Sequence, residues 1–306
     1  MLRTPARPEH LSKPPARTGG DNPPMTVSND KSRLHAPATE ESILPLDGGE
    51  IHVCQDGPRN APALLLIHGT AASARSWEPM VPLLTGAHRV IRIDLLGCGQ
   101  SAKPDRASYA IPDQARRAGA ALDRLGVEHT IVVGHSSGVA VATALAEQRP
   151  DLVTALVFIN FGPNMAAYIG EEAAIDPKQW PNFTDEQLRQ AVSSGFAPGY
   201  QIPQPFLDQV RDMDLHVFAA TSQGVRAYLN EQGLPERLAP LGKPLLVIYG
   251  EEDRRWRPSS AAEYRAVPGA IVEMLPGAGH SPNLEDPPRT AVPLLAFTAN
   301  HPRQAD

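Results

Sequence analysis

The stretch that decides the fold is Ile131-Val132-Val133-Gly134-His135-Ser136-Ser137-Gly138, which continues as Val139-Ala140-Val141-Ala142-Thr143-Ala144-Leu145-Ala146. Because β-branched residues give way to alanine and leucine, the first part predicts a buried strand and the last part a helix. Ser136 lies at the bend, where the flanking glycines leave room for crossing backbones. A serine presented there, at the N-terminal end of a helix, can act as a nucleophile if a histidine takes its proton.

Outward from this stretch, predicted strands and helices alternate in both directions. The predicted strands are 43–46, 51–54, 63–67, 90–93, 153–159, 245–249 and 271–275. The predicted helices are 73–84, 112–125, 184–192, 205–219, 259–266 and 288–298. This alternation favours right-handed crossovers, and therefore an α/β fold with a mostly parallel, doubly wound sheet.

Between the sixth and seventh strands the alternation stops, because residues 163–240 contain helical pieces and no clear strand. We interpret them as a helical lid inserted after the sixth strand, over the C-terminal edge of the sheet. Residues 1–40 are rich in proline with little periodic apolar sequence, which predicts a flexible leader. The α/β core is then expected to comprise residues 41–162 and 241–306.

Composition limits the partners of the protein. The chain has 306 residues, 42% of them hydrophobic, and a net charge of −6, which argues against a general nucleic-acid binder or a basic membrane-surface protein. Its longest apolar runs, 63–67 and 152–159, are far shorter than the roughly 20 residues that span a bilayer. With only two cysteines, a reducing, cytoplasmic location is the simpler expectation. We expect a small-molecule substrate and no nucleic-acid or membrane partner; the oligomeric state stays open.

A nucleophilic serine needs a base and an orienting acid, and ligands bind where parallel strands end. The predicted strand 245–249 is followed by Gly250-Glu251-Glu252-Asp253, and the strand 271–275 is followed by a loop that reaches Gly279-His280. His280 is therefore the candidate base, and Asp253 the preferred acid, with Glu251 and Glu252 as rivals. His68 and His135 follow no late strand and are interpreted as packed histidines that shape loops.

These motifs, together with His68-Gly69 and Asp94-x-x-Gly97-x-Gly99-x-Ser101, resemble the α/β-hydrolase superfamily, in its subgroup of lid-containing serine hydrolases and esterases. The resemblance implies that Ser136 is the nucleophile, His280 the general base and Asp253 the group that orients the imidazole. It also implies an oxyanion hole formed by the backbone N–H groups of Thr70 and Ser137, with no metal and no organic cofactor.

The implied function is hydrolysis of a carboxylic ester, lactone or thioester of a small, largely apolar molecule through an acyl-enzyme. Two alternatives stay open: another reaction on the same triad, such as carbon–carbon bond hydrolysis, cyanohydrin lysis or cyclisation of a metabolite, or a ligand receptor that is not an enzyme. Haloalkane dehalogenases and epoxide hydrolases are not expected, because these families place aspartate where Ser136 stands.

Two further features have two interpretations each. Asp253-Arg254-Arg255-Trp256-Arg257 replaces a stretch that is usually apolar; an exposed basic loop is expected, and a clamp for an acidic substrate group is the alternative. Trp77 is either a wall of the substrate pocket or a helix-packing residue. In the Gly-rich loop, Asp94 and Ser101 are expected to hold the backbone, and Cys98 to be a small filler and not a reactive thiol.

Overall fold

Eight strands form one sheet in the order β1-β2-β4-β3-β5-β6-β7-β8. The computed structural model describes Met1, residues 39–170 and residues 179–301. The strands are β1 (Glu40–Leu46), β2 (Gly49–Asp56), β3 (Ala63–Ile67), β4 (Arg89–Ile93), β5 (Thr130–His135), β6 (Val153–Ile159), β7 (Leu245–Gly250) and β8 (Ile271–Leu275). β2 pairs antiparallel with β1 and β4, and all the other pairs are parallel. The predicted α/β class with a mostly parallel sheet is confirmed.

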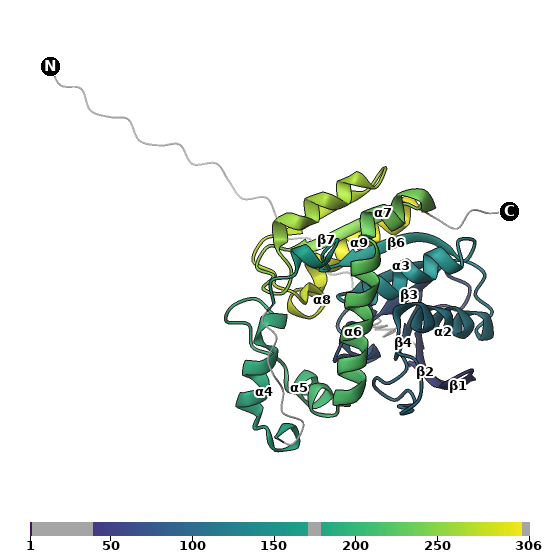
Figure 1. The fold of residues 1–306 in the computed structure, drawn as a ribbon. Helices are drawn as coiled ribbons and strands as arrows, with labels where there is room; N and C mark the ends of the chain where they lie inside the picture. Colours follow the sequence, from purple (N-terminus) through teal and green to yellow (C-terminus); the bar gives the residue numbers. More distant parts are fainter. Residues whose placement is uncertain (2–38, 171–178, 302–306) are drawn as a thin grey trace, which may run out of the picture. The chain divides into compact units, whose positions relative to one another are not determined.

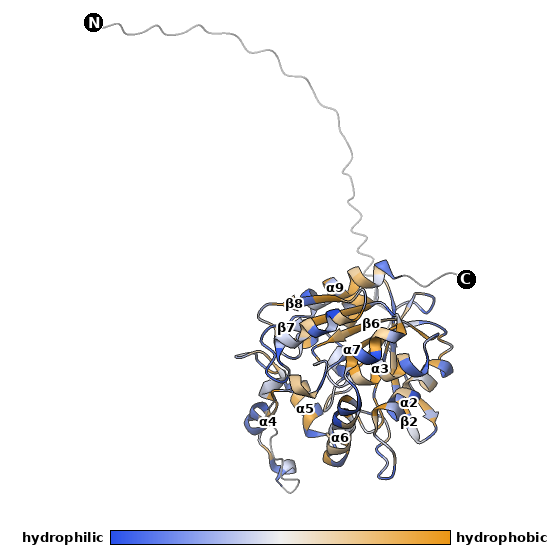
Figure 2. Cartoon of the chain, turned by 45° about the horizontal axis from the view of Figure 1, so that its top comes forward, coloured by the Kyte–Doolittle hydropathy of each residue, from blue (hydrophilic) through white to orange (hydrophobic). Residues whose placement is uncertain are grey.

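The central strands are buried on both faces because helices cover both faces. Leu65 and Ile67 of β3 point into one apolar cluster, and the alternating Leu64 and Leu66 point into another. The first cluster includes residues of α2 (Ile111–Arg124) and α3 (Gly138–Gln148), and the second includes residues of α1 (Val81–Leu84) and α9 (Pro287–Asn300). Strands covered on both sides carry continuous apolar runs, and Figure 2 shows this hydrophobic colour along the central strands.

The segment between β6 and β7 contains most of the remaining helices, and Figure 1 shows α4, α5 and α6 grouped on one side of the sheet. It consists of η2 (Met165–Ala167), η3 (Trp180–Asn182), α4 (Asp185–Val192), η4 (Ser193–Gly195), α5 (Gln204–Arg211), α6 (Leu215–Glu231), α7 (Leu234–Leu238) and η5 (Ala239–Leu241), where η denotes a 3₁₀ helix. Trp180, Leu188, Leu207 and Val210 form a small apolar core of this segment. α7 contributes Leu234 and Leu238 to the main core instead.

Two predicted helices differ from those observed. In place of one helix over 73–84 there are η1 (Ala74–Trp77) and α1, separated by a turn at Pro79, because proline has no N–H to donate to the preceding turn. In place of one helix over 205–219 there are α5 and α6. The Asp214 side chain accepts hydrogen bonds from the backbone N–H groups of His216 and Val217, and so begins a new helix.

Three smaller points complete the fold. The predicted leader, 1–40, lies outside the described residues except for Met1, Thr39 and Glu40, and Glu40 begins β1. The predicted helix 259–266 is a 3₁₀ helix, η6 (Pro258–Ala266), and a short helix, α8 (Pro282–Glu285), precedes α9. Within the described parts of the chain, no helix combines the length and apolar character needed to cross a membrane.

Candidate active site

Ser136 occupies a strained turn between β5 and α3. Its φ angle is 51°, in the left-handed region that L-residues rarely adopt. The turn is possible because two backbones approach closely there: a Cβ added to Gly138 would lie 2.4 Å from the carbonyl oxygen of Ile67, and one added to Gly134 would lie 2.6 Å from the nitrogen of Val139. The two glycines of the motif therefore allow β5, the turn and α3 to pack beside β3.

Ser136, His280 and Asp253 form one chain of hydrogen bonds. His280 Nδ1 lies 2.9 Å from Asp253 Oδ2, and His280 Nε2 lies 2.9 Å from Ser136 Oγ. Because an ionised carboxylate only accepts, Nδ1 carries the proton and Nε2 is left to accept the hydroxyl proton of Ser136. The rival acids Glu251 and Glu252 are exposed, whereas Asp253 is 4% exposed.

The Asp253 carboxylate accepts four hydrogen bonds. Oδ2 accepts from His280 Nδ1 and from Asn160 Nδ2, and Oδ1 accepts from the backbone N–H groups of Arg255 and Trp256 at 2.7 and 3.1 Å. Burial by itself would raise the pKa of Asp253, but His280 and these donors lower it, and the net effect is a pKa below the usual value. Asp253 is therefore ionised, and its orientation is fixed.

Asn160 joins the ends of three strands and was missed in the sequence analysis. It is fully buried and directly follows β6, with a φ angle of 48°. Its Nδ2 donates to Asp253 Oδ2 at 2.9 Å and to the carbonyl of Gly279 at 3.0 Å, while its Oδ1 accepts from the N–H of Gly250 at 3.0 Å. The signal was present, because a polar residue at the end of a parallel strand is the pattern that selected Asp253 and His280.

Glu285 holds the other side of the His280 loop. Its carboxylate accepts from the backbone N–H groups of Gly279 and Ser281, at 2.8 and 2.9 Å, and of Ala197 in the inserted segment, at 3.0 Å. It therefore fixes the residues before and after His280 and connects them to that segment. No local pattern in the sequence indicates this role, because Glu285 lies in the short helix α8, which is not predicted from the sequence.

Thr70 and Ser137, the predicted oxyanion residues, lie side by side. Thr70 Oγ1 donates to Ser137 Oγ at 2.8 Å, which ties the loop after β3 to the start of α3. Among residues 39–170 and 179–301, neither backbone N–H donates to another group of the protein. Two unused N–H groups beside a nucleophile are what an oxyanion hole requires. The neighbouring Ala71 has a φ angle of 62°, so this loop is also strained.

The other histidines support the site from behind. His135 Nε2 lies 2.9 Å from the carbonyl oxygen of His280. Burial, and then the proximity of His280, lower the pKa of His135 to about 3, so the neutral ring donates to that carbonyl. Burial also lowers the pKa of His68, whose Nε2 accepts the N–H of Leu95 at 3.0 Å. Both are packed residues that hold loops, as the sequence analysis expected.

The Gly-rich loop is held by Asp94 and Ser101. Asp94 accepts from the N–H groups of Ala74 and Gln100, at 2.6 and 2.8 Å, and Ser101 Oγ donates to the carbonyl of Asp94 at 2.6 Å. Burial, together with Asp94, raises the pKa of Cys98 to about 12, so this thiol stays protonated and is not a nucleophile.

Ser136 lines two small cavities under the inserted segment. One, of about 80 Å³, is walled by His280 and by Trp180, Phe206, Val210 and Met213 of that segment. The other, of about 110 Å³, is walled by Phe161, Tyr168, Val225 and Trp256. Arg255 and Phe218 line both. The apolar walls are typical of a small-molecule site.

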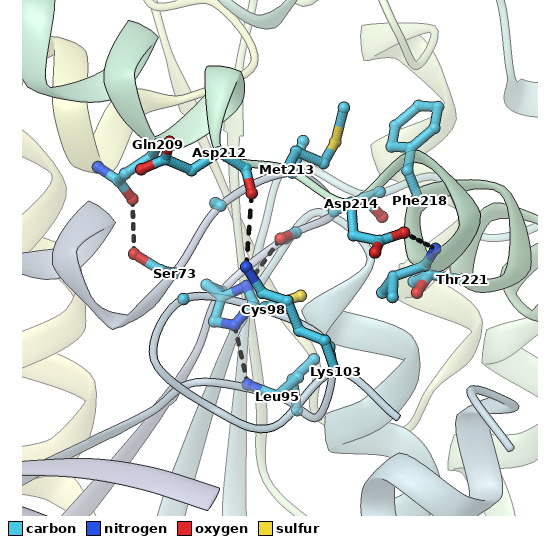
Figure 3. A pocket seen from close by; sticks show the side chains of 18 of the residues that line it. Ser73, Leu95, Cys98, Lys103, Gln209, Asp212, Met213, Asp214, Phe218 and Thr221 are labelled. Atoms are coloured by element: carbon cyan, nitrogen blue, oxygen red, sulfur yellow. Dashed lines mark hydrogen bonds between the residues drawn. The ribbon is translucent and has the colours of Figure 1, made fainter. Parts of the chain in front are cut away.

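A larger cavity of about 220 Å³ adjoins Thr70 and Ser137 but is not lined by Ser136. At its edge, Ser73 Oγ donates to Gln209 Oε1 at 2.6 Å and Lys103 Nζ lies 3.4 Å from the carbonyl oxygen of Asp212 (Figure 3). These contacts join the loops after β3 and β4 to the inserted segment. Because Ser136 lines the two smaller cavities and not this one, they are the better candidates for a substrate site.

Trp77 has to be corrected as a candidate pocket residue. It is fully buried in the apolar cluster between the sheet and α9, and it lines neither of the cavities at Ser136. Its ring packs edge-on against His135, with 6.3 Å between the centroids. Trp77 ends η1, which directs its side chain into this apolar cluster and away from the cavities. Trp77 therefore contributes to the packing of the core.

One side-chain group in the described residues has the composition of a metal site: Glu41, His52 and Cys54, on β1 and β2. His52 Nε2 lies 3.4 Å from Glu41 Oε2 and 3.9 Å from Cys54 Sγ, and His52 Nδ1 lies 2.9 Å from Asp94 Oδ2. Burial raises the pKa of Cys54 to about 12. The group also lies away from the residues that line the cavities at Ser136.

Comparison with known proteins decides the family. Residues 62–287 match the family model described as the alpha/beta hydrolase fold. The chain belongs to the α/β-hydrolase family. A haloalkane dehalogenase of Bradyrhizobium diazoefficiens is 36% identical over 117 residues, which are 38% of this chain and 37% of that protein.

Two longer matches within the α/β-hydrolase family cover most of the chain. Carboxylesterase YbfK of Bacillus subtilis (strain 168) is 24% identical over 262 residues, 81% of this chain and 84% of that protein. The crystal structure of the N-acyl homoserine lactonase AidH has a TM-score of 0.73 at 19% identity, over 88% of this chain and 99% of that one. At that identity the second match shows the shared fold alone.

Proposed function

We propose that this α/β-hydrolase is a serine hydrolase that cleaves a carboxylic ester, lactone or thioester of a small, largely apolar molecule. The observation that carries the proposal is the hydrogen-bonded chain Ser136–His280–Asp253, with 2.9 Å at each link. The similarity to a carboxylesterase over 81% of the chain supports the same reaction class. Serine at position 136 does not fit the aspartate nucleophile of the dehalogenase mechanism.

In the first half of the reaction, Ser136 Oγ attacks the carbonyl carbon while His280 Nε2 takes its proton. Negative charge then develops on the carbonyl oxygen, where the N–H groups of Thr70 and Ser137 stabilise it. His280 gives the proton to the leaving alcohol or thiol, and the acyl group stays on Ser136. In the second half, His280 takes a proton from water, the hydroxide attacks the acyl carbon, and the acid leaves as Ser136 regains its proton.

The ionised Asp253 acts through His280 and is not protonated in this cycle. It keeps the Nδ1 proton in place and stabilises the imidazolium that forms in each half-reaction. The four donors on Asp253 hold it in that position.

The decisive experiment measures turnover of p-nitrophenyl esters together with labelling by a fluorophosphonate. We expect the label at Ser136, and a loss of several powers of ten in turnover for Ser136→Ala and for His280→Ala. The double variant should lose little more, because the two residues act as one unit. Ser259→Ala removes an exposed serine and serves as the matched control.

The other outcomes distinguish the alternatives. Full activity in Ser136→Ala, or a label on another residue, would remove the assignment of the nucleophile. Labelling at Ser136 without turnover of any ester, thioester or lactone would favour a receptor or a different reaction on the same three residues.

A further inference from the structure

Arg255 follows the catalytic loop directly, and its backbone is fixed at both ends. Its N–H donates to Asp253 Oδ1 at 2.7 Å, and its carbonyl accepts from the N–H groups of Ile169 and Gly170 at 2.9 and 3.1 Å. The exposed basic loop that the sequence predicts is confirmed for Arg254 and Arg257, whose side chains are exposed. Arg255 differs, because its side chain is partly buried and lines both cavities at Ser136.

The guanidinium of Arg255 has few partners for a partly buried cation. Its Nε donates to Ser194 Oγ at 3.2 Å, and within the described residues Nη1 and Nη2 donate to no acceptor. No carboxylate of the described residues lies within ion-pair distance of it. The guanidinium groups of the neighbouring arginines do have acceptors at their Nη atoms. Arg254 donates to the carbonyls of Ser193 and Phe196, and Arg257 donates to the carbonyl of Ala166.

The cavities at Ser136 supply no counter-charge to Arg255. Within the described chain, neither cavity at Ser136 is lined by aspartate or glutamate. Asp253 is nearby, but both of its oxygens are already occupied by donors. Burial lowers the pKa of Arg255, and Tyr168 and Asp253 offset this effect only in part. A guanidinium with two free NH₂ groups matches a carboxylate, which accepts two parallel hydrogen bonds.

We propose that Arg255 is a specificity-determining residue, and that it binds a carboxylate carried by the substrate. This inference rests on the proposed function and names the substrate class: an ester, lactone or thioester with a free carboxylate a few bonds from the cleaved carbonyl. Because Arg255 lies between the two cavities, the apolar parts of the substrate occupy the cavities and the carboxylate lies at their junction.

The kinetic test compares two esters of equal acyl length, p-nitrophenyl hydrogen glutarate and p-nitrophenyl pentanoate. Arg255→Gln should lower kcat/KM about tenfold to a hundredfold for the glutarate ester and leave the pentanoate ester nearly unchanged, because only the first loses a charge-assisted pair. Arg255→Lys should recover part of the loss. Arg257→Gln removes an exposed arginine of the same loop and should change neither value.

A binding measurement keeps the inference testable without turnover. The anilide of glutaric acid and the anilide of pentanoic acid, titrated calorimetrically into the wild-type protein, should differ at least about tenfold in Kd, and Arg255→Gln should abolish the difference. Equal affinities in the wild type, or an equal preference in Arg255→Gln, would overturn the inference. Failure to hydrolyse either ester with an intact binding preference would count against the proposed function alone.

Discussion

Asn160 offers the sharpest test of how the site is built. In Asn160→Gly the positive φ angle is kept without strain, and what is lost is the side chain that connects Asp253, Gly279 and Gly250. The hydrogen bond to the Asp253 carboxylate is charge-assisted and is worth about 1.5–3 kcal/mol. The buried N–H of Gly250 loses its acceptor, which costs about 1–3 kcal/mol. Because the bonds share one network they do not add fully, and we expect a loss of about 3–5 kcal/mol in the free energy of unfolding.

The same substitution should affect turnover. Without the Asn160 donor, Asp253 can rotate, and the imidazole that it orients moves with it. A misplacement of this kind costs about a hundredfold in rate. Urea unfolding gives the stability, and hydrolysis of a p-nitrophenyl ester gives the rate.

Asn164→Gly is the matched control, because Asn164 is a partly exposed asparagine that caps η2 and donates to Glu263. For Asn164→Gly we expect the free energy of unfolding to change by about a few tenths of a kcal/mol, because glycine is nearly as good an N-cap as asparagine. We expect turnover to stay unchanged. If Asn160→Gly lost less than about 1 kcal/mol and kept its full rate, the network would not be what positions Asp253.

Three further outcomes follow from the structure. The pKa of His135 is lowered from 6.5 to about 3 in the folded protein. Between these two pH values His135 is therefore protonated in the unfolded chain and neutral in the folded protein. The contribution of the neutral, buried His135 to stability is fully present above pH 6.5 and is lost as the pH falls toward 3. His135→Gln should therefore flatten the fall in unfolding free energy over that range, by up to about 1.4 kcal/mol per pH unit, and parallel pH profiles would contradict this. Phe218→Ala, at the wall of all three cavities, should reorder a series of esters by acyl length, whereas Leu188→Ala, in the small core of the inserted segment, should lower the melting temperature and leave the order intact. Trp77→Ala should lower the free energy of unfolding by about 3–5 kcal/mol without changing the ranking of the esters. A changed ranking would show that Trp77 forms part of the pocket wall.

The sheet could be predicted because its signal is local. β3, β6 and β7 each contain an unbroken run of five apolar residues, so the place of these strands in the chain needs no knowledge of the fold. The observed β6 and β8 have the predicted limits, 153–159 and 271–275. Two predicted helices are each divided by a single residue, although the periodic pattern of apolar residues continues across it. These residues are Pro79 and Asp214.

The site could be predicted only as far as strand ends reveal it. Asp253 and His280 could be predicted because each is a polar residue that follows a late strand. Asn160 directly follows β6, so the same criterion could have identified it. Glu285 was not, because its partners are backbone N–H groups that the fold brings together from distant parts of the chain. The partial burial of Arg255 depends on where the inserted segment lies, which no local pattern encodes.

The three non-glycine residues with a positive φ angle in the described chain, Ala71, Ser136 and Asn160, all lie at the site. A left-handed alanine such as Ala71 costs about 1–2 kcal/mol, against a total stability of about 5–15 kcal/mol for a typical protein. At Ser136 and Asn160 the side chain is indispensable, but Ala71 makes no side-chain hydrogen bond. Engineering for heat resistance should therefore begin at position 71, where glycine would relieve the strain while the backbone N–H groups of Thr70 and Ser137 stay in place.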